Sequence, residues 1–345
     1  MTSSYADDIR SAARQDLPWD ALRGQRVLIT GATGLIGSCV VELLLASPAE
    51  CLVVAAGRDK ERAARLFARH AGDGRLTFLR HDVTKPLDAD LRFDYIIHAA
   101  SGASPSAFAQ TPVEVMKTNI YGTAALLDHG RAHQMKRMLY VSSGEVYGQC
   151  ADSVLTEDCA GRVDSMNPRS CYPSAKRAAE TLCAAYAQEY GTDIVVARPS
   201  HVFGPCFTET DNRVYAQFIR NVLRGEDIVM KSDGSQCRSW CYVVDCASAL
   251  LHVLLKGERG EAYNVADPTS TLTIKELAQM VAQTAGRKVV MSQPTGAERS
   301  VFNPMKTAVF STRKIEELGW RLTDGDMRRK MATTIEAAKL KELQK

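Results

Sequence analysis

The sequence lacks several patterns that would place the protein in familiar classes. It contains no uninterrupted apolar run near the roughly 20 residues that a membrane-spanning helix needs. Its polar, mixed-charge start has no apolar core of the kind found in secretion signals. The 43 lysines and arginines nearly balance the 40 aspartates and glutamates, without a basic stripe or tail. We therefore expect a cytoplasmic protein that binds neither membranes nor nucleic acid.

Cysteine and histidine also lack the spacing of familiar metal ligands. The ten cysteines include no C-x-x-C pair, and the seven histidines are scattered along the chain. Several cysteines lie within apolar segments, namely Cys39, Cys51, Cys183 and Cys246. We expect these thiols to be reduced and mostly buried, and we expect no metal site.

Short, almost continuously apolar runs alternate with helical segments through the first two hundred residues. The predicted strands cover residues 26–30, 51–57, 76–83, 94–100, 137–143 and 193–200. Two long helices are predicted over residues 111–133 and 171–190. This alternation predicts an α/β fold, a Rossmann-type doubly wound parallel sheet that helices cover on both faces.

The alternation loosens after residue 200, where Pro205 and polar stretches interrupt it. A strand over 262–266 and a helix with a capping box at Thr273 and Glu276 follow. This half of the chain therefore reads as a smaller, mixed C-terminal substrate lobe. We assign residues 25–200, plus about 240–266, to a dinucleotide-binding domain, 201–239 and 267–335 to the substrate-binding lobe, and 1–24 to an N-terminal helical extension.

The segment "TGATGLIG" places Gly31, Gly34 and Gly37 at the turn between the first strand and an apolar helix. Glycines let the backbone approach a pyrophosphate, and the helix N-terminus supplies N–H groups and positive dipole. The spacing G-x-x-G-x-x-G at this place predicts dinucleotide binding. The alternative is a glycine turn that serves only tight packing.

The end of the second strand bears on the choice between NAD and NADP. An acid there bonds the ribose 2′-hydroxyl of NAD, whereas a nearby arginine accommodates the 2′-phosphate of NADP. Arg58 stands beside the place where this acid is expected, which favours NADP. The alternatives are that Asp59 bonds the 2′-hydroxyl of NAD and that Arg58 stacks on the adenine. The further cofactor contacts that we expect are Thr33, Leu35, Ile36, Asp82, Val83, Ala99, Ala100, Ser101 and Asn119.

Tyr172 and Lys176 lie four residues apart in a predicted helix and so share one face. A cation near a phenol lowers the tyrosine pKa, which would let Tyr172 accept a proton from a substrate hydroxyl. Lys176 could also bond the nicotinamide ribose. The spacing is common by chance, and it gains meaning here from the glycine turn upstream and from Ser143 at a strand end.

Several segments together resemble the extended short-chain dehydrogenase/reductases over about residues 25–330. They are "TGATGLIGS", "HAAS", "SSGEVYG", "YPSAK" and "RPSHVFGP", in that order. Within the nucleotide-sugar epimerase, dehydratase and decarboxylase branch, "NPRSCYPSAKRAAETL", "DNRVYAQFI" and "DGSQCRSWCYVVD" are similar to UDP-glucuronate decarboxylases. The resemblance implies a tightly bound NAD(P)(H) cofactor and a nucleotide-sugar substrate.

The resemblance also implies roles for individual residues. Ser143 would bond the substrate hydroxyl, Tyr172 would be the base and Lys176 its electrostatic support, with Glu145 as a further catalytic group. Tyr172, Lys176 and His201 would also contact the cofactor. The implied substrate-binding residues are Ser143, Gly144, Glu145, His201, Arg213 and Arg238. Many relatives have Asn at the position of His201, so His201 could either bond the diphosphate or line the wall of the site.

Gly144 and Glu145 bear on the reaction. At the place of Gly144 and Glu145, the dehydratases carry a sequence that resembles "DE" and the decarboxylases one that resembles "SE". Gly144 has no side chain and so cannot supply the acid that elimination of water requires. After oxidation at sugar C4, decarboxylation needs no such acid, so a UDP-glucuronate decarboxylase-like reaction is the interpretation we favour. A 4-epimerase and a 4-ketosugar reductase stay open, a 4,6-dehydratase is less favoured, and a non-catalytic dinucleotide-sensing protein is the alternative of another class.

The two long helices carry apolar residues beyond a single core stripe, such as Val113, Met116 and Leu126. By analogy with the family, we expect helices 111–133 and 171–190 to form a homodimer interface. The alternative is that these residues only cover the sheet.

Overall fold

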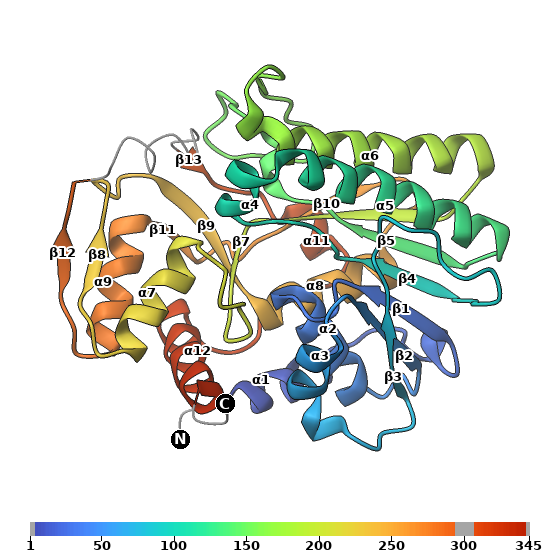
Figure 1. Ribbon diagram of the computed structural model, residues 1–345, viewed down its shortest axis with the longest axis horizontal. Coiled ribbons are helices and arrows are strands. Elements are labelled where there is room, and N and C mark those ends of the chain that lie inside the picture. Colours follow the sequence, from blue (N-terminus) through green and yellow to red (C-terminus); the bar gives the residue numbers. More distant parts are fainter. Residues whose placement is uncertain (1–3, 294–306, 343–345) are drawn as a thin grey trace.

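The computed structural model describes residues 4–293 and 307–342, and its centre is a seven-stranded parallel sheet (Figure 1). The strand order is β10-β6-β5-β4-β1-β2-β3. The strands are β1 (Arg26–Thr30), β2 (Leu52–Gly57), β3 (Leu76–Arg80), β4 (Tyr95–His98), β5 (Arg137–Val141), β6 (Ile194–Pro199) and β10 (Ala262–Val265). From β1 the sheet grows in one direction through β2 and β3, and from β4 onward it grows in the opposite direction. Open α/β sheets bind ligands at such a reversal of strand order. The predicted fold class is confirmed.

The central strands are apolar throughout because both of their faces are covered. In β1, Val27 and Ile29 lie in the core beneath α2 (Leu35–Ala46) and α8 (Val243–Lys256), whereas Leu28 points into the core beneath α5 (Pro112–Ala132) and α6 (Cys171–Tyr190). Leu28 pairs with Val54 of β2 and with Ile96 of β4. Alternate residues therefore serve two separate cores, which explains the unbroken hydrophobicity of the strand.

The helices form one layer on each face of the sheet. One layer contains α1 (Tyr5–Ala12), α2 (Leu35–Ala46), α3 (Lys60–Leu66) and α8 (Val243–Lys256). The other contains α4 (Pro105–Gln110), α5 (Pro112–Ala132) and α6 (Cys171–Tyr190), with α5 and α6 side by side (Figure 1). Short 3₁₀ turns are η1 (Trp19–Leu22), η2 (Ala68–His70), η3 (Gly144–Tyr147) and η4 (Pro168–Ser170).

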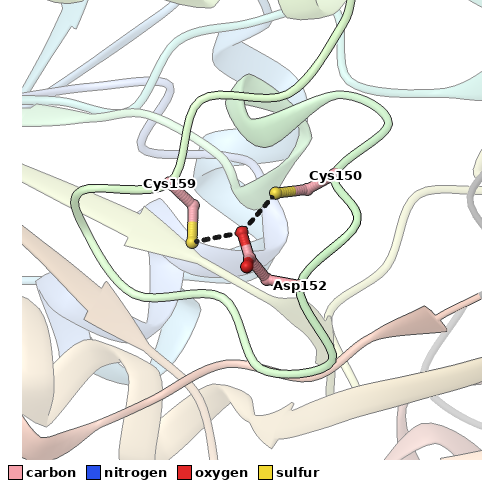
Figure 2. A group of neighbouring side chains, drawn as sticks. All are labelled: Cys150, Asp152 and Cys159. Atoms are coloured by element: carbon pink, nitrogen blue, oxygen red, sulfur yellow. Dashed lines mark hydrogen bonds between the residues drawn. The ribbon is translucent and has the colours of Figure 1, made fainter.

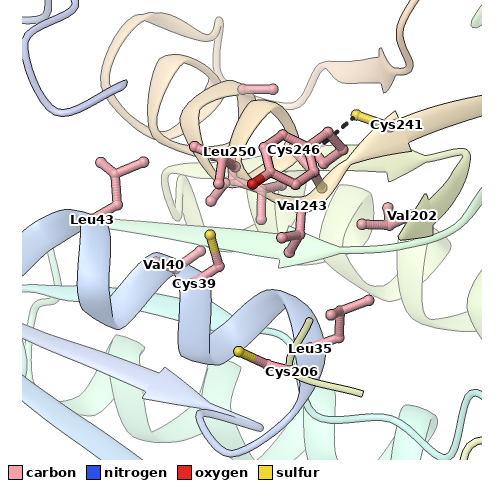
Figure 3. Packing of buried hydrophobic residues seen from close by; sticks show 14 of the residues in the cluster. Leu35, Cys39, Val40, Leu43, Val202, Cys206, Cys241, Val243, Cys246 and Leu250 are labelled. Atoms are coloured by element: carbon pink, nitrogen blue, oxygen red, sulfur yellow. Dashed lines mark hydrogen bonds between the residues drawn. The ribbon is translucent and has the colours of Figure 1, made fainter. Parts of the chain in front are cut away.

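Cysteines serve as small apolar residues in the core between α2 and α8. Figure 3 shows Cys39 and Cys246 among leucine and valine side chains of these helices. All ten cysteines of the chain lie in described segments, none forms a disulfide, and seven are buried. The prediction of mostly buried, unpaired thiols is confirmed.

A smaller lobe follows β6 in the sequence. Its sheet joins β11 (Thr271–Thr273), β9 (Cys237–Tyr242) and β13 (Thr307–Ala308), with β7 (His201–Phe203) also paired to β9. A separate pair is β8 (Ile228–Met230) and β12 (Val289–Met291). The helices of the lobe are α7 (Val214–Leu223), α9 (Ile274–Thr284), α11 (Arg313–Glu317) and α12 (Met327–Glu342). The assignment of domain boundaries stays a prediction.

The helix α9 begins as its sequence predicts. The Thr273 hydroxyl accepts a hydrogen bond from the Glu276 N–H at 3.1 Å, and the Glu276 carboxylate accepts one from the Thr273 N–H at 2.7 Å. This capping box satisfies two backbone donors that the first turn leaves without helical partners.

The first and last described helices are joined through one carboxylate. Asp8 of α1 is buried, and it accepts hydrogen bonds from the Tyr242 hydroxyl at 3.0 Å and from Arg329 Nη1 at 2.7 Å.

Among the described helices, none combines the length and apolarity that crossing a bilayer requires.

Candidate active site

The glycine turn between β1 and α2 has no room for side chains. Gly31 has a φ of +68°, and a Cβ there would lie 2.7 Å from the Ala99 carbonyl oxygen. A Cβ on Gly37 would lie 2.3 Å from the Gly31 carbonyl oxygen. Gly34 caps α2 without a side-chain hydrogen bond, so the N–H groups of the first turn face outward without side-chain caps. This cradle fits the pyrophosphate of a dinucleotide.

Two residues predicted to contact the middle of the cofactor lie together beyond the glycine turn. The Ser101 hydroxyl donates to Asn119 Oδ1 at 3.0 Å. Asn119 is buried in α5, and its Nδ2 donates to the Val115 carbonyl at 2.8 Å. The main-chain N–H of Ala99 bonds the carbonyl of Thr30, so the predicted "HAAS" segment continues from β4 beside the turn. The structure thus gathers these predicted contacts at the carboxyl ends of β1 and β4.

The end of β2 presents Arg58 rather than a free acid. Asp59 caps α3, where its Oδ1 accepts a hydrogen bond from the Arg62 N–H at 2.9 Å. Arg58 is exposed. The pKa of Asp82 is lowered chiefly by hydrogen bonds from Thr84 and further by the charge of Arg58. Arg58 and Asp82 therefore share one neighbourhood, where the adenosine end of the cofactor is predicted.

Tyr172 and Lys176 lie one turn apart at the start of α6, and both are buried. Lys176 Nζ donates to the Val141 carbonyl at 2.8 Å and lies 5.8 Å from the centroid of the Tyr172 ring. Burial lowers the pKa of Lys176 to about 7. Burial also raises the pKa of Tyr172 to about 12, despite a hydrogen bond with Ser143 that lowers it. The expectation that the lysine lowers the tyrosine pKa is therefore wrong for the free protein, because burial dominates and the ammonium bonds a carbonyl.

An aromatic ring and a cation support Tyr172 from the side. Phe108 of α4 stacks on Tyr172 with ring centroids 4.8 Å apart and an interplanar angle of 24°. The guanidinium of Arg169 lies 4.6 Å from the centroid of the Phe108 ring. Neither residue is among the sequence predictions. Arg169 stands three residues before Tyr172, whereas no local pattern marks Phe108.

Glu145 is held by a bidentate ion pair. Arg169 Nη1 and Nη2 donate to its two carboxylate oxygens, each at 3.1 Å. The side chains of Arg169 and Glu145 are only 15% and 21% exposed. The planar fork fixes the orientation of the carboxylate, and η3 places it two residues after Ser143, whose Oγ accepts a hydrogen bond from the Glu145 N–H.

Gly144 is confined by a residue distant in the sequence. A Cβ at this position would lie 2.2 Å from Phe310 Cζ. Phe310 is 4% exposed, and its ring packs against that of Tyr147. Any side chain at position 144 therefore requires Phe310 to move.

Three basic side chains from the smaller lobe meet near Tyr172 and Glu145. His201 of β7 is buried, and burial followed by the charges of Arg238 and Arg213 lowers its pKa to about 3. Within the described residues its Nδ1 has no hydrogen-bond partner. Burial lowers the pKa of Arg238 to about 10 against an opposing effect of Glu145, and the charge of Arg213 lowers the pKa of Tyr172. The predicted substrate residues thus converge from both parts of the chain.

The fold is that of a class, the Rossmann-type enzymes that act through a nicotinamide dinucleotide, and the predicted set of Ser143, Tyr172 and Lys176 lies where this class would use it. The model of the NAD dependent epimerase/dehydratase family matches residues 27–266. The chain belongs to this family, and by that membership it is an enzyme that depends on a nicotinamide dinucleotide.

Similar curated proteins carry a decarboxylase name. UDP-glucuronic acid decarboxylase 6 from Arabidopsis thaliana is 34% identical over 296 residues, which cover 86% of this chain and 83% of that protein. UDP-glucuronic acid decarboxylase 1 from Danio rerio is 34% identical over 261 residues, which cover 74% of this chain and 60% of that protein. The resemblance expected from the motifs is confirmed.

Solved structures of two other activities share the fold. The dTDP-glucose 4,6-dehydratase DesIV from Streptomyces venezuelae, with NAD bound, aligns with a TM-score of 0.78 and 26% identity. The alignment covers 90% of this chain and 96% of the other. The UDP-glucose 4-epimerase from Thermus thermophilus, in complex with NAD, aligns with a TM-score of 0.74 and 25% identity, covering 91% and 98%. Both of these neighbours hold NAD.

Proposed function

We propose that this protein removes the C5 carboxylate of a nucleotide-linked uronic acid, with UDP-glucuronate as the substrate, through a transient ketone at sugar C4. Sugar C4 is oxidised, the carboxylate leaves as CO₂, C5 takes up a proton, and the C4 hydroxyl is restored. The cofactor is regenerated and not consumed.

The lack of room for a side chain at Gly144 is the observation that favours decarboxylation over elimination of water. Elimination of water from C6 requires an acid beside Glu145, and the Phe310 ring occupies the volume in which its side chain would lie. Loss of CO₂ leaves an electron pair that the C4 ketone accepts, so it requires no acid for a leaving hydroxyl. Glu145, whose carboxylate Arg169 holds in place, and Arg238 would orient the substrate for this step.

The chain's own residues supply the proton transfers at C4. When bound, the nicotinamide cofactor provides the acceptor, and later the donor, of the hydrogen at C4. Tyr172 must be ionised to take the hydroxyl proton, and the positive charge of a bound, oxidised nicotinamide would lower its pKa from the value of about 12 in the free protein. As phenolate it takes the hydroxyl proton and later returns it, while Ser143 bonds the same substrate oxygen. Arg213, whose fork is oriented by its ion pair with Asp211, and Arg238 would bind the acidic groups of the nucleotide sugar, because guanidinium forks match phosphate and carboxylate oxygens.

Incubation with UDP-glucuronate, UDP-glucose and dTDP-glucose, followed by mass spectrometry, tests the reaction. We expect loss of CO₂ from UDP-glucuronate and no loss of water from either glucose donor. Loss of water from a glucose donor would contradict the argument from Gly144. An unchanged mass with an inverted C4 configuration by NMR would make the protein a 4-epimerase.

Single substitutions on α6 separate catalysis from folding. Tyr172→Phe removes one hydroxyl, and we expect turnover to fall by about 100-fold or more, in line with the usual contribution of a general base. Cofactor binding should be retained. Tyr186→Phe on the same helix is the matched control, because the Tyr186 hydroxyl bonds Asp128, away from the site. Equal activity of the two variants would contradict the proposed role of Tyr172.

We propose further that the cofactor is NADP rather than NAD. Asp59 is already engaged as a helix cap, and Arg58 is exposed at the end of β2. Fluorescence titration with NADPH and NADH tests this choice, with Arg58→Ala and the exposed Arg65→Ala as its control. We expect Arg58→Ala alone to weaken NADPH binding about tenfold, the loss of one charge-assisted bond, without affecting NADH. Preference for NADH in the unaltered protein would overturn the proposal.

We propose a homodimer that joins α5 and α6 with the same helices of a second copy. Val113 and Tyr121 of α5 are 60% and 58% exposed, whereas Leu126 and Leu127 are buried against the sheet. Tyr121→Glu should yield a monomer in analytical ultracentrifugation, and Met166→Glu, an exposed position outside both helices, should not. An unaltered protein that sediments as a monomer would contradict the proposal.

We also propose that the protein works in the cytoplasm. Its ten cysteines are unpaired, and the half-buried Cys150, Cys159 and Cys237 would be open to oxidation in an oxidising compartment. Fractionation of the source cells, with immunodetection of the protein in each fraction, tests this location, and recovery outside the cytoplasm would contradict it.

A further inference from the structure

The loop between η3 and η4 brings two thiols and one carboxylate together (Figure 2). The Cys150 thiol donates to Asp152 Oδ2 at 2.8 Å, and the Cys159 thiol donates to the same oxygen at 3.4 Å. The three potential ligand atoms all lie within 4.8 Å of one another. Two of the three side chains are half-buried and the carboxylate is exposed, so an ion can enter from solvent.

We propose that Cys150, Asp152 and Cys159 bind a zinc ion through three protein ligands, with a fourth position open to solvent. Thiolate and carboxylate ligands suit this borderline-soft ion, and three protein ligands plus water is a common zinc arrangement. The pattern C-x-D-x₆-C differs from the familiar C-x-x-C spacing, which is why a search for that spacing predicts no metal here.

The dimensions of the cluster match such a site after small shifts. Zinc takes sulfur at about 2.3 Å and oxygen at about 2.1 Å, which in a tetrahedron separates sulfur from oxygen by about 3.6 Å and two sulfurs by about 3.8 Å. The observed sulfur-to-oxygen distances of 2.8 and 3.4 Å lie below that value by less than 1 Å. Rotation about the side-chain bonds of an exposed loop can supply the difference.

The surrounding backbone holds the ligands in place. The loop is closed by a bridge between Gln149 and Arg162, whose N–H groups each bond the other's carbonyl at 2.9 Å. The Thr156 N–H donates to Cys159 Sγ at 3.3 Å. Hydrogen bonds of this kind hold a metal-binding side chain in the orientation that the metal needs.

The local charge also favours a cation. Residues 150–161 contain Asp152, Glu157 and Asp158 and no lysine, arginine or histidine. Glu157 is not a further ligand, because its carboxylate accepts a hydrogen bond from the Asn264 N–H at 2.8 Å. The fourth position is therefore left to water.

A bound ion would fasten the loop that supports the Gly144 region. Leu155 lies between the ligands in sequence, and its N–H bonds the Val309 carbonyl at 2.7 Å while its carbonyl accepts from the Ser311 N–H at 2.9 Å. These bonds hold the segment that carries Phe310. The zinc site is separate from the catalytic groups, and the proposal does not depend on the reaction.

Metal analysis of the full chain, purified under reducing conditions and dialysed against zinc, tests the proposal. We expect one zinc per chain. Cys150→Ser, Cys159→Ser and Asp152→Asn should each weaken binding by more than about 100-fold, which exceeds the effect of losing a residue that only orients a ligand. Cys237→Ser, the other half-buried cysteine, and Asp164→Asn, an exposed acid of the same loop, are the matched controls and should keep the ion.

Cobalt provides a readout of ligand identity. Cobalt bound in place of zinc should show thiolate-to-metal charge-transfer absorption that Cys150→Ser and Cys159→Ser each reduce and that Cys237→Ser leaves unchanged. Binding that the three cluster variants do not alter would overturn the proposal. A protein that binds no zinc while its thiol count shows Cys150 joined to Cys159 would overturn it as well.

Discussion

The buried ammonium of Lys176 should make the stability of the cofactor-free protein depend on pH. Lys176 is 2% exposed, and burial lowers its pKa from 10.5 to about 7. Between these values the unfolded chain holds a proton that the folded chain has lost. The free energy of unfolding therefore rises with pH in this range, because stability increases wherever the unfolded state binds more protons.

The size of the effect follows from the same two values. One proton of difference changes the free energy of unfolding by about 1.4 kcal/mol per pH unit. Because Lys176 is half-titrated at about pH 7 in the folded state, the gain between pH 7 and pH 8.5 is about 1.6 kcal/mol. Lys176→Met has no titrating group and should lack this gain.

Urea unfolding at several pH values between 7 and 8.5, followed by circular dichroism, measures the effect on protein stripped of cofactor. The window lies above the range in which His98 and His201 contribute, since burial lowers the pKa of each to about 3. The quantity of interest is the difference between the two pH profiles, so groups common to both proteins cancel. Lys136→Met, at an exposed position, should follow the unaltered protein. Parallel profiles for Lys176→Met and the unaltered protein would refute the reasoning.

Three further substitutions test the packing. Gly144→Ser should lower the free energy of unfolding by about 1 to 3 kcal/mol through collision with Phe310, and adding Phe310→Leu should recover part of it in urea titrations. Gly37→Ala should weaken NAD(P)H binding in fluorescence titrations, because its Cβ would meet a backbone oxygen of the cofactor turn; unchanged affinity would contradict the cradle. Lys330→Met should cost about 3 to 5 kcal/mol in urea unfolding by leaving Asp245 buried without its ion-pair partner at 2.8 Å, and adding Asp245→Asn should relieve most of that cost.

The elements of the fold could be predicted from the sequence because their signals are local. The strand over 26–30 agrees with β1 residue for residue, and the helices predicted over 111–133 and 171–190 agree with α5 and α6 to within one residue at each end. Glycine turns, proline in first turns and capping boxes act within a few residues of the ends that they define. The strand predicted over 94–100 runs past the end of β4 because the apolar residues Ala99 and Ala100 follow it, and the strand predicted over 76–83 runs past the end of β3 through His81 and Asp82 to Val83.

The finer structure of the site could not be predicted, because it depends on contacts between distant parts of the chain. Nothing near Gly144 in the sequence indicates that Phe310 fills its side-chain space. Burial also reverses an argument made from sequence alone, since a lysine four residues from a tyrosine suggests a lowered phenol pKa, whereas the enclosed phenol of Tyr172 titrates at about 12. The ion pair between Glu145 and Arg169 could not be predicted either, because the two residues meet only when η3 and η4 come together.

The buried carboxylate of Asp8 can meet both of its hydrogen-bond partners only late in the synthesis of the chain. Its partners Tyr242 and Arg329 lie 234 and 321 residues further along the chain. At a synthesis rate of roughly 5 to 20 residues per second, α1 waits about 15 to 60 s on the ribosome before α12 is complete. During that interval α1 can pack on α2 and then on α8, but the side of α1 that meets α12 stays uncovered. The bond between α1 and α12 is therefore among the last contacts that the growing chain can form.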